Sequence, residues 1–141
     1  MVDTPKHSVS VAGIVVDDQD RVLVIQRRDN GHWEPPGGVL ELEETPEDGV
    51  RREVFEETGI QVSVKSLSGV YKNVSRGVVA LVYRCTAEAG SPRVSDETVR
   101  VEWKSFADAI SGMDDVYAIR VEDAIIGETS ASRSHDGVRL Y

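Results

Sequence analysis

A run of acidic residues around one predicted helix places the tightest constraint on how this chain folds. Residues 41–57 hold eight Asp or Glu side chains against two arginines, a local charge of −6. Within the run, Glu53, Glu56 and Glu57 are spaced three and four residues apart, which places them on one face of a helix. Like charges at that spacing destabilise an isolated helix by about 0.2–0.5 kcal/mol per pair. The fold therefore has to tolerate or neutralise this face.

Two interpretations of the acidic face differ in what lies against it. In the first, the face is exposed to water, as most charge runs are. In the second, it binds a hard divalent cation, because Mg²⁺ and Mn²⁺ prefer carboxylate and carbonyl oxygens. Gly37 and Gly38 precede the helix and allow main-chain oxygen to approach an ion closely. We therefore expect Mg²⁺ or Mn²⁺ at this face.

Cap and turn residues bound this helix within a chain that mixes strands and helices. Thr45 suits the N-cap, Pro46 suits the first helical position, and Gly59 is the usual residue just past a helix end. The order of elements predicts an α/β domain with helices packed on a sheet. Predicted strands cover residues 7–18 and 20–28, which form a hairpin, and residues 61–71, 77–88 and 98–103; predicted helices cover residues 106–113 and 116–126.

The composition limits the classes of partner and the compartment. With 141 residues and a net charge of −9, the chain lacks the basic character typical of proteins that bind nucleic-acid polymers. Its apolar runs are far shorter than the ~20 residues of a membrane span, and residues 1–8 lack a signal-peptide pattern. The single Cys85 excludes an intrachain disulfide and fits a reducing compartment. We expect a cytoplasmic monomer or homodimer, with one domain at residues 1–127 and a loosely held polar tail at residues 128–141.

The stretch from Gly38 to Ile60, GVLELEETPEDGVRREVFEETGI, resembles the signature of the Nudix hydrolases. That signature is a glycine, five residues, a glutamate, seven residues, and then R-E-U-x-E-E-x-G-U, in which U is a bulky aliphatic residue. The resemblance covers about residues 8–126. It implies an α/β/α sandwich with a mixed sheet, in which the signature forms a loop–helix–loop, and hydrolysis of a nucleoside diphosphate linked to another group. Every defined position is matched, by Gly38, Glu44, Arg52, Glu53, Val54, Glu56, Glu57, Gly59 and Ile60.

The resemblance also implies roles for residues of the signature. It assigns the metal site to Glu53, Glu56 and Glu57 together with the carbonyl of Gly38, and it leaves the general base as either Glu53 or Glu56. Arg52 is expected to orient a glutamate, since on a helix it lies one turn from Glu56. The remaining signature acid, at position 44, is either an outer metal or structural position or a solvated side chain.

Further candidates lie outside the signature. The segment SDETVRVEW resembles the later loop of MutT-like members, in which Glu97 is the candidate for one more metal ligand. Trp33 stands where MutT-like members have W-x-F-P-G-G, but Pro35 replaces the aromatic residue, so Trp33 either packs in the core or contacts substrate. Arg27 and Arg28 end a predicted strand that faces the glycine turn, where either is a candidate for holding a phosphate.

The substrate within the family stays open at this point. Position 76, where many ADP-ribose hydrolases carry proline, is Arg76, and position 77, where dinucleoside polyphosphate hydrolases carry tyrosine, is Gly77. We favour a MutT-like nucleoside triphosphate pyrophosphohydrolase, with an ADP-ribose or nucleotide-sugar pyrophosphatase as the alternative. A nucleotide-sensing domain without catalysis is a third interpretation, which the intact signature disfavours. No zinc site is expected, because the three histidines share no ligand spacing: His7, His32 and His135.

Overall fold

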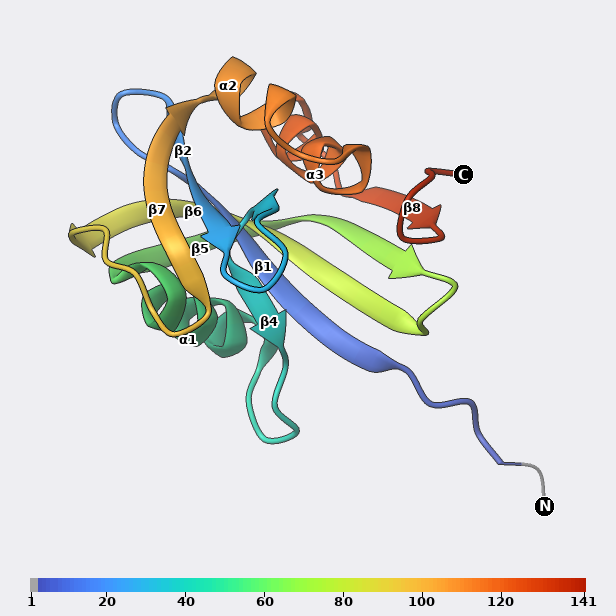
Figure 1. Ribbon diagram of the computed structural model, residues 1–141. Helices are drawn as coiled ribbons and strands as arrows, with labels where there is room; N and C mark the ends of the chain where they lie inside the picture. Colours follow the sequence, from blue (N-terminus) through green and yellow to red (C-terminus); the bar gives the residue numbers. More distant parts are fainter. Residues whose placement is uncertain (1–2) are drawn as a thin grey trace.

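The computed structural model describes residues 3–141 and contains one mixed β-sheet between helices (Figure 1). The strands are β1 (Ser8–Val16), β2 (Arg21–Arg27), β3 (Trp33–Glu34), β4 (Gly37–Val39), β5 (Ile60–Asn73), β6 (Val78–Gly90), β7 (Thr98–Ser105) and β8 (Ala131–His135), and the helices are α1 (Pro46–Thr58), α2 (Phe106–Ser111) and α3 (Asp115–Ile126). The sheet runs β3-β2-β1-β6-β5-β8, with β4 paired to β1 and β7 paired to β2. Within the described residues, no helix is both long and apolar enough to cross a membrane.

The two faces of the sheet carry separate cores, and β1 contributes to both. Val11 and Val15 pack on the side of α1, whereas Ile14 packs on the side of α2 and α3. Side chains of a strand alternate between faces, so a strand covered on both sides is apolar throughout. Cys85 is buried in the core on the α1 side, and this burial raises the pKa of its thiol to about 12. The predicted α/β/α architecture is confirmed, and Cys85 lies in the buried part of strand β6.

The first two strands form the predicted hairpin only beside their turn. There β1 and β2 pair through Val16 and Val22. Further along, β1 takes β4 as its antiparallel neighbour, and β2 takes β7. Because the two strands separate, the glycine turn at β4 lies against the middle of β1. This change of partner positions the turn beside helix α1. The two strands therefore differ from the simple hairpin that the sequence predicts.

Helix α1 begins and ends at the predicted cap residues. The hydroxyl of Thr45 accepts a hydrogen bond of 3.1 Å from the backbone N–H of Asp48. At the other end, Gly59 has a φ of 78°, a left-handed conformation that glycine adopts without steric cost. Val50 and Val54 are fully buried against the sheet. This buried pair fixes the rotation of the helix about its axis, which directs the signature glutamates toward β4 and the loop before β7.

Residues 128–141, expected to be a loosely held tail, differ from that expectation. Part of this segment is the strand β8, which extends the sheet by pairing in parallel with the end of β5. Arg133 of β8 also forms an ion pair of 2.7 Å with Asp123 of α3. The sequence of β8, ASRSH, lacks the apolar alternation by which strands are recognised. The domain boundary at residue 127 stays a prediction.

Candidate active site

The glycine turn lies against α1 because β4 pairs with the middle of β1. In this register Gly38 is opposite Val11, and Gly37 is opposite Ala12. A Cβ on Gly37 would overlap the carbonyl oxygen of Val11, whereas a Cβ on Gly38 would lie 2.5 Å from a carboxylate oxygen of Glu53, at the movable end of a side chain. Gly37 is thus required by the close approach of two backbones. The result is a β4 backbone in direct contact with a signature glutamate.

Glu57 is the most buried of the signature glutamates. Its side chain belongs to a residue that is 4% exposed, and one carboxylate oxygen accepts a hydrogen bond of 2.7 Å from the N–H of Gly37. Burial raises the pKa of this carboxyl to about 8, and the negative charges of Glu53 and Glu97 add to the increase, while the bond from Gly37 opposes it. The ionised form of Glu57 is therefore costly unless a positive charge joins it.

Arg52 joins three carboxylates to the glycine turn. Its Nε and Nη2 donate to the two oxygens of Glu44 at 2.9 and 2.6 Å. Its Nη1 donates to Glu53 at 2.9 Å and to Glu56 at 3.3 Å, and Nη2 also donates to the carbonyl of Val39 at 3.2 Å. The two-point contact with Glu44 is its strongest. Arg52 thus holds two signature glutamates in place, and the expected pair with Glu56 is one of several.

Glu97 approaches the same glutamates from the loop before β7. Its carboxylate raises the pKa of both Glu53 and Glu57, for each of which burial is the largest cause. The main chain here is anchored to the end of β2, since the carbonyl of Glu97 accepts a hydrogen bond of 2.9 Å from the N–H of Arg28. The structure therefore gathers acidic side chains from α1 and from a loop far away in the sequence.

Glu53, Glu56, Glu57 and Glu97 form an acidic group whose chemistry fits a hard divalent cation. Glu53 and Glu57 both have raised pKa values because they are buried, and a nearby cation favours their ionised forms. Across residues 3–141, no three carboxylate, imidazole or thiol side chains already converge on a single point. Glu53 is directed to Arg52 and Glu57 to the N–H of Gly37. Each of these contacts uses only the Oε1 atom of its carboxylate, which leaves Oε2 available to an ion.

In metal-free buffer, we expect the stability of the protein to fall as the pH rises from about 5 to about 8. Folded Glu57 keeps its proton up to a pKa of about 8, whereas an unfolded glutamate has a pKa of about 4.3. Between these values the folded state binds more protons than the unfolded state, so the free energy of unfolding decreases with pH. Glu57→Gln removes the ionisation, and its amide oxygen still accepts the bond from Gly37.

Thermal unfolding in EDTA at both pH values measures this effect. Glu57→Gln should melt close to the wild type at about pH 5 and several degrees higher at about pH 8, since one pKa unit corresponds to about 1.36 kcal/mol. Glu47→Gln is the matched control, because Glu47 is exposed on the same helix, and it should follow the wild type. A wild type that melts above Glu57→Gln at about pH 8 would contradict the raised pKa.

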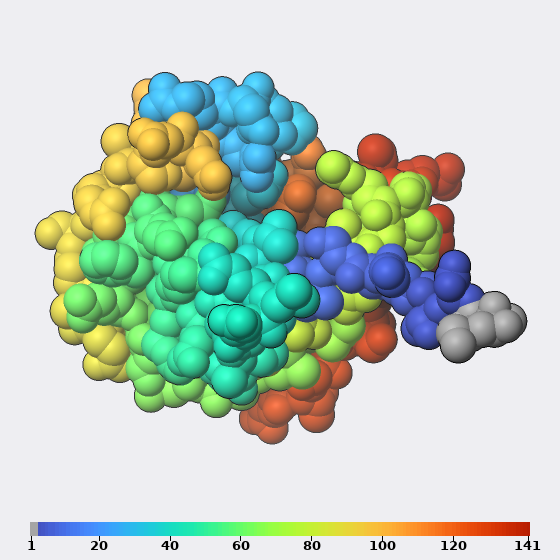
Figure 2. All heavy atoms as spheres, turned by 90° about the horizontal axis from the view of Figure 1, so that it is seen from below, coloured from blue at the N-terminus to red at the C-terminus, as the bar shows by residue number. Residues whose placement is uncertain are grey.

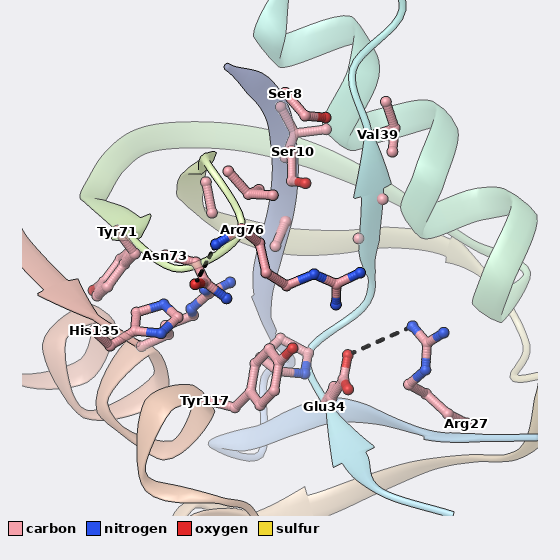
Figure 3. Close-up of a pocket in the computed structure, with 18 residues that line it drawn as sticks. Ser8, Ser10, Arg27, Glu34, Val39, Tyr71, Asn73, Arg76, Tyr117 and His135 are labelled. Carbon is pink, nitrogen blue, oxygen red and sulfur yellow. Dashed lines mark hydrogen bonds and ion pairs between the residues drawn. The ribbon is translucent and has the colours of Figure 1, made fainter. Parts of the chain in front are cut away.

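A cleft of about 520 Å³ borders the acidic group through Gly37 and Gly38. Figure 2 shows the hollow between the region around residues 30–40 and the β5–β6 turn, with part of α3 at its floor. Three arginines and one glutamate line it, drawn in part in Figure 3. In a chain with a net charge of −9, this cleft is locally electropositive. Such a surface suits a phosphorylated small molecule.

The two arginines predicted to hold phosphate have different positions. Arg27 lines the cleft, where its Nε and Nη2 also bond to Asp29 at 2.9 and 2.7 Å. Arg28 is absent from the lining; its guanidinium donates to the carbonyls of Asp96 and Thr98 at 3.1 and 3.2 Å. Arg28 therefore secures the loop before β7. Arg27 is the better placed of the two for contact with a phosphate.

Trp33 packs against the core on the side of α2 and α3 and is absent from the cleft lining. The ammonium of Lys104 lies 3.6 Å from the centre of its ring, close enough for a cation–π contact. Of the two roles considered for Trp33, the geometry favours packing over substrate contact. Pro35, which replaces the aromatic residue of MutT-like members, lines the cleft instead.

Sequence reasoning missed the end of the cleft formed by Arg76, Arg120 and His135. These residues come from the β5–β6 turn, from α3 and from β8. Arg76 figured only as a mismatch to ADP-ribose hydrolases, and His135 only as a histidine without ligand spacing. One signal was available, because Arg120 lies one helical turn after the buried Val116. Arginine is rarely buried without a partner, so its place on an apolar helix face points to a function.

Comparison with known proteins identifies the class to which this fold and site belong. The NUDIX domain family matches residues 6–122, and the chain therefore belongs to the Nudix hydrolases. A MutT-like protein from Streptomyces ambofaciens is 57% identical over 136 residues, which cover 96% of this chain and 88% of that protein. The predicted family, fold and hydrolase class are confirmed.

Two further comparisons extend this result. An ADP-ribose pyrophosphatase from Methanocaldococcus jannaschii is 36% identical over 103 residues, which cover 68% of this chain and 60% of that protein. The crystal structure of a NUDIX hydrolase from Nitrosomonas europaea superposes with a TM-score of 0.81 at 20% identity and covers 96% of this chain and 83% of that one. The structural likeness supports the fold alone, and the names of the sequence relatives leave the substrate within the family open.

Proposed function

We propose that this protein is a nucleoside triphosphate pyrophosphohydrolase that requires Mg²⁺ or Mn²⁺ and releases a nucleoside monophosphate and pyrophosphate. The observation that carries the proposal is the buried carboxylate of Glu57, which accepts a hydrogen bond from the N–H of Gly37. Gly37 also lines the electropositive cleft, so the acidic group and the cleft adjoin at this residue. The likeness to the MutT-like protein from Streptomyces ambofaciens favours a triphosphate as substrate.

The signature residues divide the work of this reaction. Glu53, Glu56 and Glu57, with the carbonyl of Gly38, would hold the ion, and Glu97 is a further ligand. When bound, the ion screens the phosphate charge and lowers the pKa of attached water. Either Glu53 or Glu56 takes the proton from the attacking water, a step that requires a base within about 2.6–3.2 Å directly or through one water.

The positions of both candidate bases depend on Arg52. Its Nη1 contacts Glu53 and Glu56 at the same time, and its two-point bond to Glu44 fixes the guanidinium itself. We therefore place Arg52 among the residues that position the base, while Arg27 is the candidate for binding a phosphate of the substrate.

A second candidate function is hydrolysis of ADP-ribose or a nucleotide sugar, which is favoured by the relative from Methanocaldococcus jannaschii that carries the name ADP-ribose pyrophosphatase. A nucleotide-sensing domain without catalysis is disfavoured by the complete signature. In each case the partner is a small nucleotide. A cytoplasmic location stays a prediction that rests on the free, buried Cys85.

Hydrolysis in oxygen-18 water tests the proposed function on a panel of nucleoside triphosphates, ADP-ribose and nucleotide sugars. We expect a triphosphate to give a monophosphate and pyrophosphate, with the heavy oxygen located by mass spectrometry. Release of orthophosphate alone from the terminal position would contradict the proposed reaction. A higher kcat/KM for ADP-ribose or a nucleotide sugar selects the second candidate, and nucleotide binding without any turnover selects the sensing domain.

A further inference from the structure

Arg120 is a buried arginine that forms no ion pair with any carboxylate of residues 3–141. It is 9% exposed, and its Cζ lies 5.1 Å from the ring centre of Tyr71 and 5.0 Å from that of Tyr117. Its Nε has no hydrogen-bond partner among residues 3–141. Glu34, the carboxylate of the cleft, lies 3.9 Å from Arg27 in an ion pair of its own. The charge of Glu34 also acts on Arg120, but the two form no ion pair within residues 3–141. A guanidinium stays protonated in proteins, so Arg120 keeps a charge that no ion pair neutralises and an Nε donor without a partner.

His135 supplies a second unused donor at the same end of the cleft. It is 3% exposed, and its Nδ1 accepts a hydrogen bond of 3.0 Å from the N–H of Gly137. A nitrogen that accepts carries no proton, so the neutral ring bears its proton on Nε2. Burial, and then the charge of Arg120, lower the pKa of this imidazole and keep it neutral. Within the described part of the chain, Nε2 has no partner.

Both donors line the same cleft, and a further arginine stands beside them. Arg76 comes from the β5–β6 turn and lines the same cleft as Tyr117. Figure 3 shows Arg76 and Tyr117 pointing into the space between His135 and the strand that carries Val39. Buried donors without acceptors are costly. A ligand that offers oxygen acceptors and negative charge would satisfy all of these groups.

We propose that this end of the cleft is an anion subsite, in which Arg120 and His135 donate hydrogen bonds to a phosphate or carboxylate of the substrate. This inference rests on the proposed function, because it assumes that the diphosphate of the substrate binds at the signature glutamates beside Gly38. The substrate is then a nucleotide that carries a second acidic group beyond the bond that is cleaved. Arg76 reinforces the charge of the subsite from the turn above it.

Binding of inorganic phosphate in EDTA tests the subsite apart from catalysis. Long-range ¹H–¹⁵N NMR spectra of the full chain report each imidazole, and they should show the proton of His135 on Nε2. Addition of phosphate should shift the His135 signals in a saturable way, with the exposed His7 and His32 as internal references. Acetate in place of phosphate separates the two anion classes, and the anion that binds more tightly identifies the class. A His135 signal unmoved by either anion would overturn the proposal.

Substitutions connect this shift to Arg120. Arg120→Gln should abolish the shift at His135, and Arg120→Lys, which keeps the charge but loses the Nε donor, should weaken phosphate binding at least tenfold. Arg100→Gln is the matched control, because Arg100 is an exposed arginine 3.5 Å from Glu102 on β7. It should leave the shift unchanged. An equal response in Arg120→Gln and the wild type would place phosphate elsewhere and refute the subsite.

Melting temperatures separate a ligand-binding arginine from one that only packs. Arg120→Met removes a buried charge without a partner, so the variant should melt at the same temperature as the wild type or higher. If Arg120 served only to fill the space between Tyr71 and Tyr117, its loss should lower the melting temperature and leave phosphate binding intact. That pair of results would contradict the proposal.

A matched pair of substrates then tests use of the subsite in turnover with Mg²⁺. A nucleotide that carries an additional 2′- or 3′-phosphate should have a kcat/KM at least tenfold above that of the same nucleotide without it, and Arg120→Gln should remove the preference. If the two nucleotides have the same kcat/KM and phosphate does not shift the His135 signals, the subsite is overturned and the proposed function still stands. A shift at His135 in EDTA without hydrolysis of any nucleotide supports the subsite and overturns the proposed function.

Discussion

Glu57→Gln should lower kcat by at least about a hundredfold at saturating Mg²⁺, because loss of charge stabilisation at the metal removes several kcal/mol and each 1.36 kcal/mol is about tenfold in rate. The substitution keeps the size of the side chain and preserves an oxygen for the N–H of Gly37, which Glu57 holds at 2.7 Å. It removes one anion from the site. The same variant should be at least as stable as the wild type in metal-free buffer, so a loss of rate is not a loss of fold.

Glu47→Gln is the control for this experiment. Glu47 lies on the same helix, is exposed, and falls outside the fixed positions of the signature. Its substitution should leave kcat near the wild-type value. If the acidic face were only a solvated surface, Glu57→Gln would relieve repulsion and cost no activity. Full activity in both variants would therefore remove Glu57 from the metal site.

The signature helix was predictable from sequence because its determinants are local. Thr45 and Gly59 mark its ends through backbone hydrogen bonding and conformation, and Val50 and Val54 form its buried side. The glutamate spacing then places the acids relative to that side. Each of these statements depends only on residues a few positions apart.

Other parts of the fold depend on contacts between distant segments. The separation of β1 from β2 follows from the competing partners β4 and β7, which no periodicity in the two strands specifies. Strand β8 is polar and exists through main-chain pairing with β5 and an ion pair between Arg133 and Asp123. For the same reason, sequence analysis missed the contribution of β8 to the cleft.

The candidate site likewise combines residues that the sequence identifies with residues that only the structure identifies. The resemblance located the acids of α1, and Glu97 was found because a loop acid follows the signature in MutT-like members. The choice between Arg27 and Arg28 required the structure, since the loop carbonyls that bind Arg28 belong to residues 68 and 70 positions away. Arg120 was missed although it lies one helical turn after Val116, because α3 also carries three acidic residues and resembles an ordinary amphipathic helix.

Removal of divalent cations should abolish hydrolysis altogether. This effect and that of Glu57→Gln on kcat are the two largest we predict. Without an ion, Glu57 is buried with a pKa raised to about 8, and the negative charges of Glu53 and Glu97 act on it. An anionic phosphate would meet these acids without screening. Arg27 and the other arginines of the cleft attract the substrate, but they do not neutralise the carboxylates at the glycine turn. We therefore expect binding of nucleotide without turnover in the metal-free protein.

The most direct test of this account is the rate of nucleotide hydrolysis before chelation, in excess EDTA, and after Mg²⁺ or Mn²⁺ is added back. Circular dichroism in EDTA should show that the protein stays folded throughout. We predict that hydrolysis is abolished in EDTA and returns when either ion exceeds the chelator. Undiminished turnover in excess EDTA would contradict the assignment of the signature glutamates to a metal site.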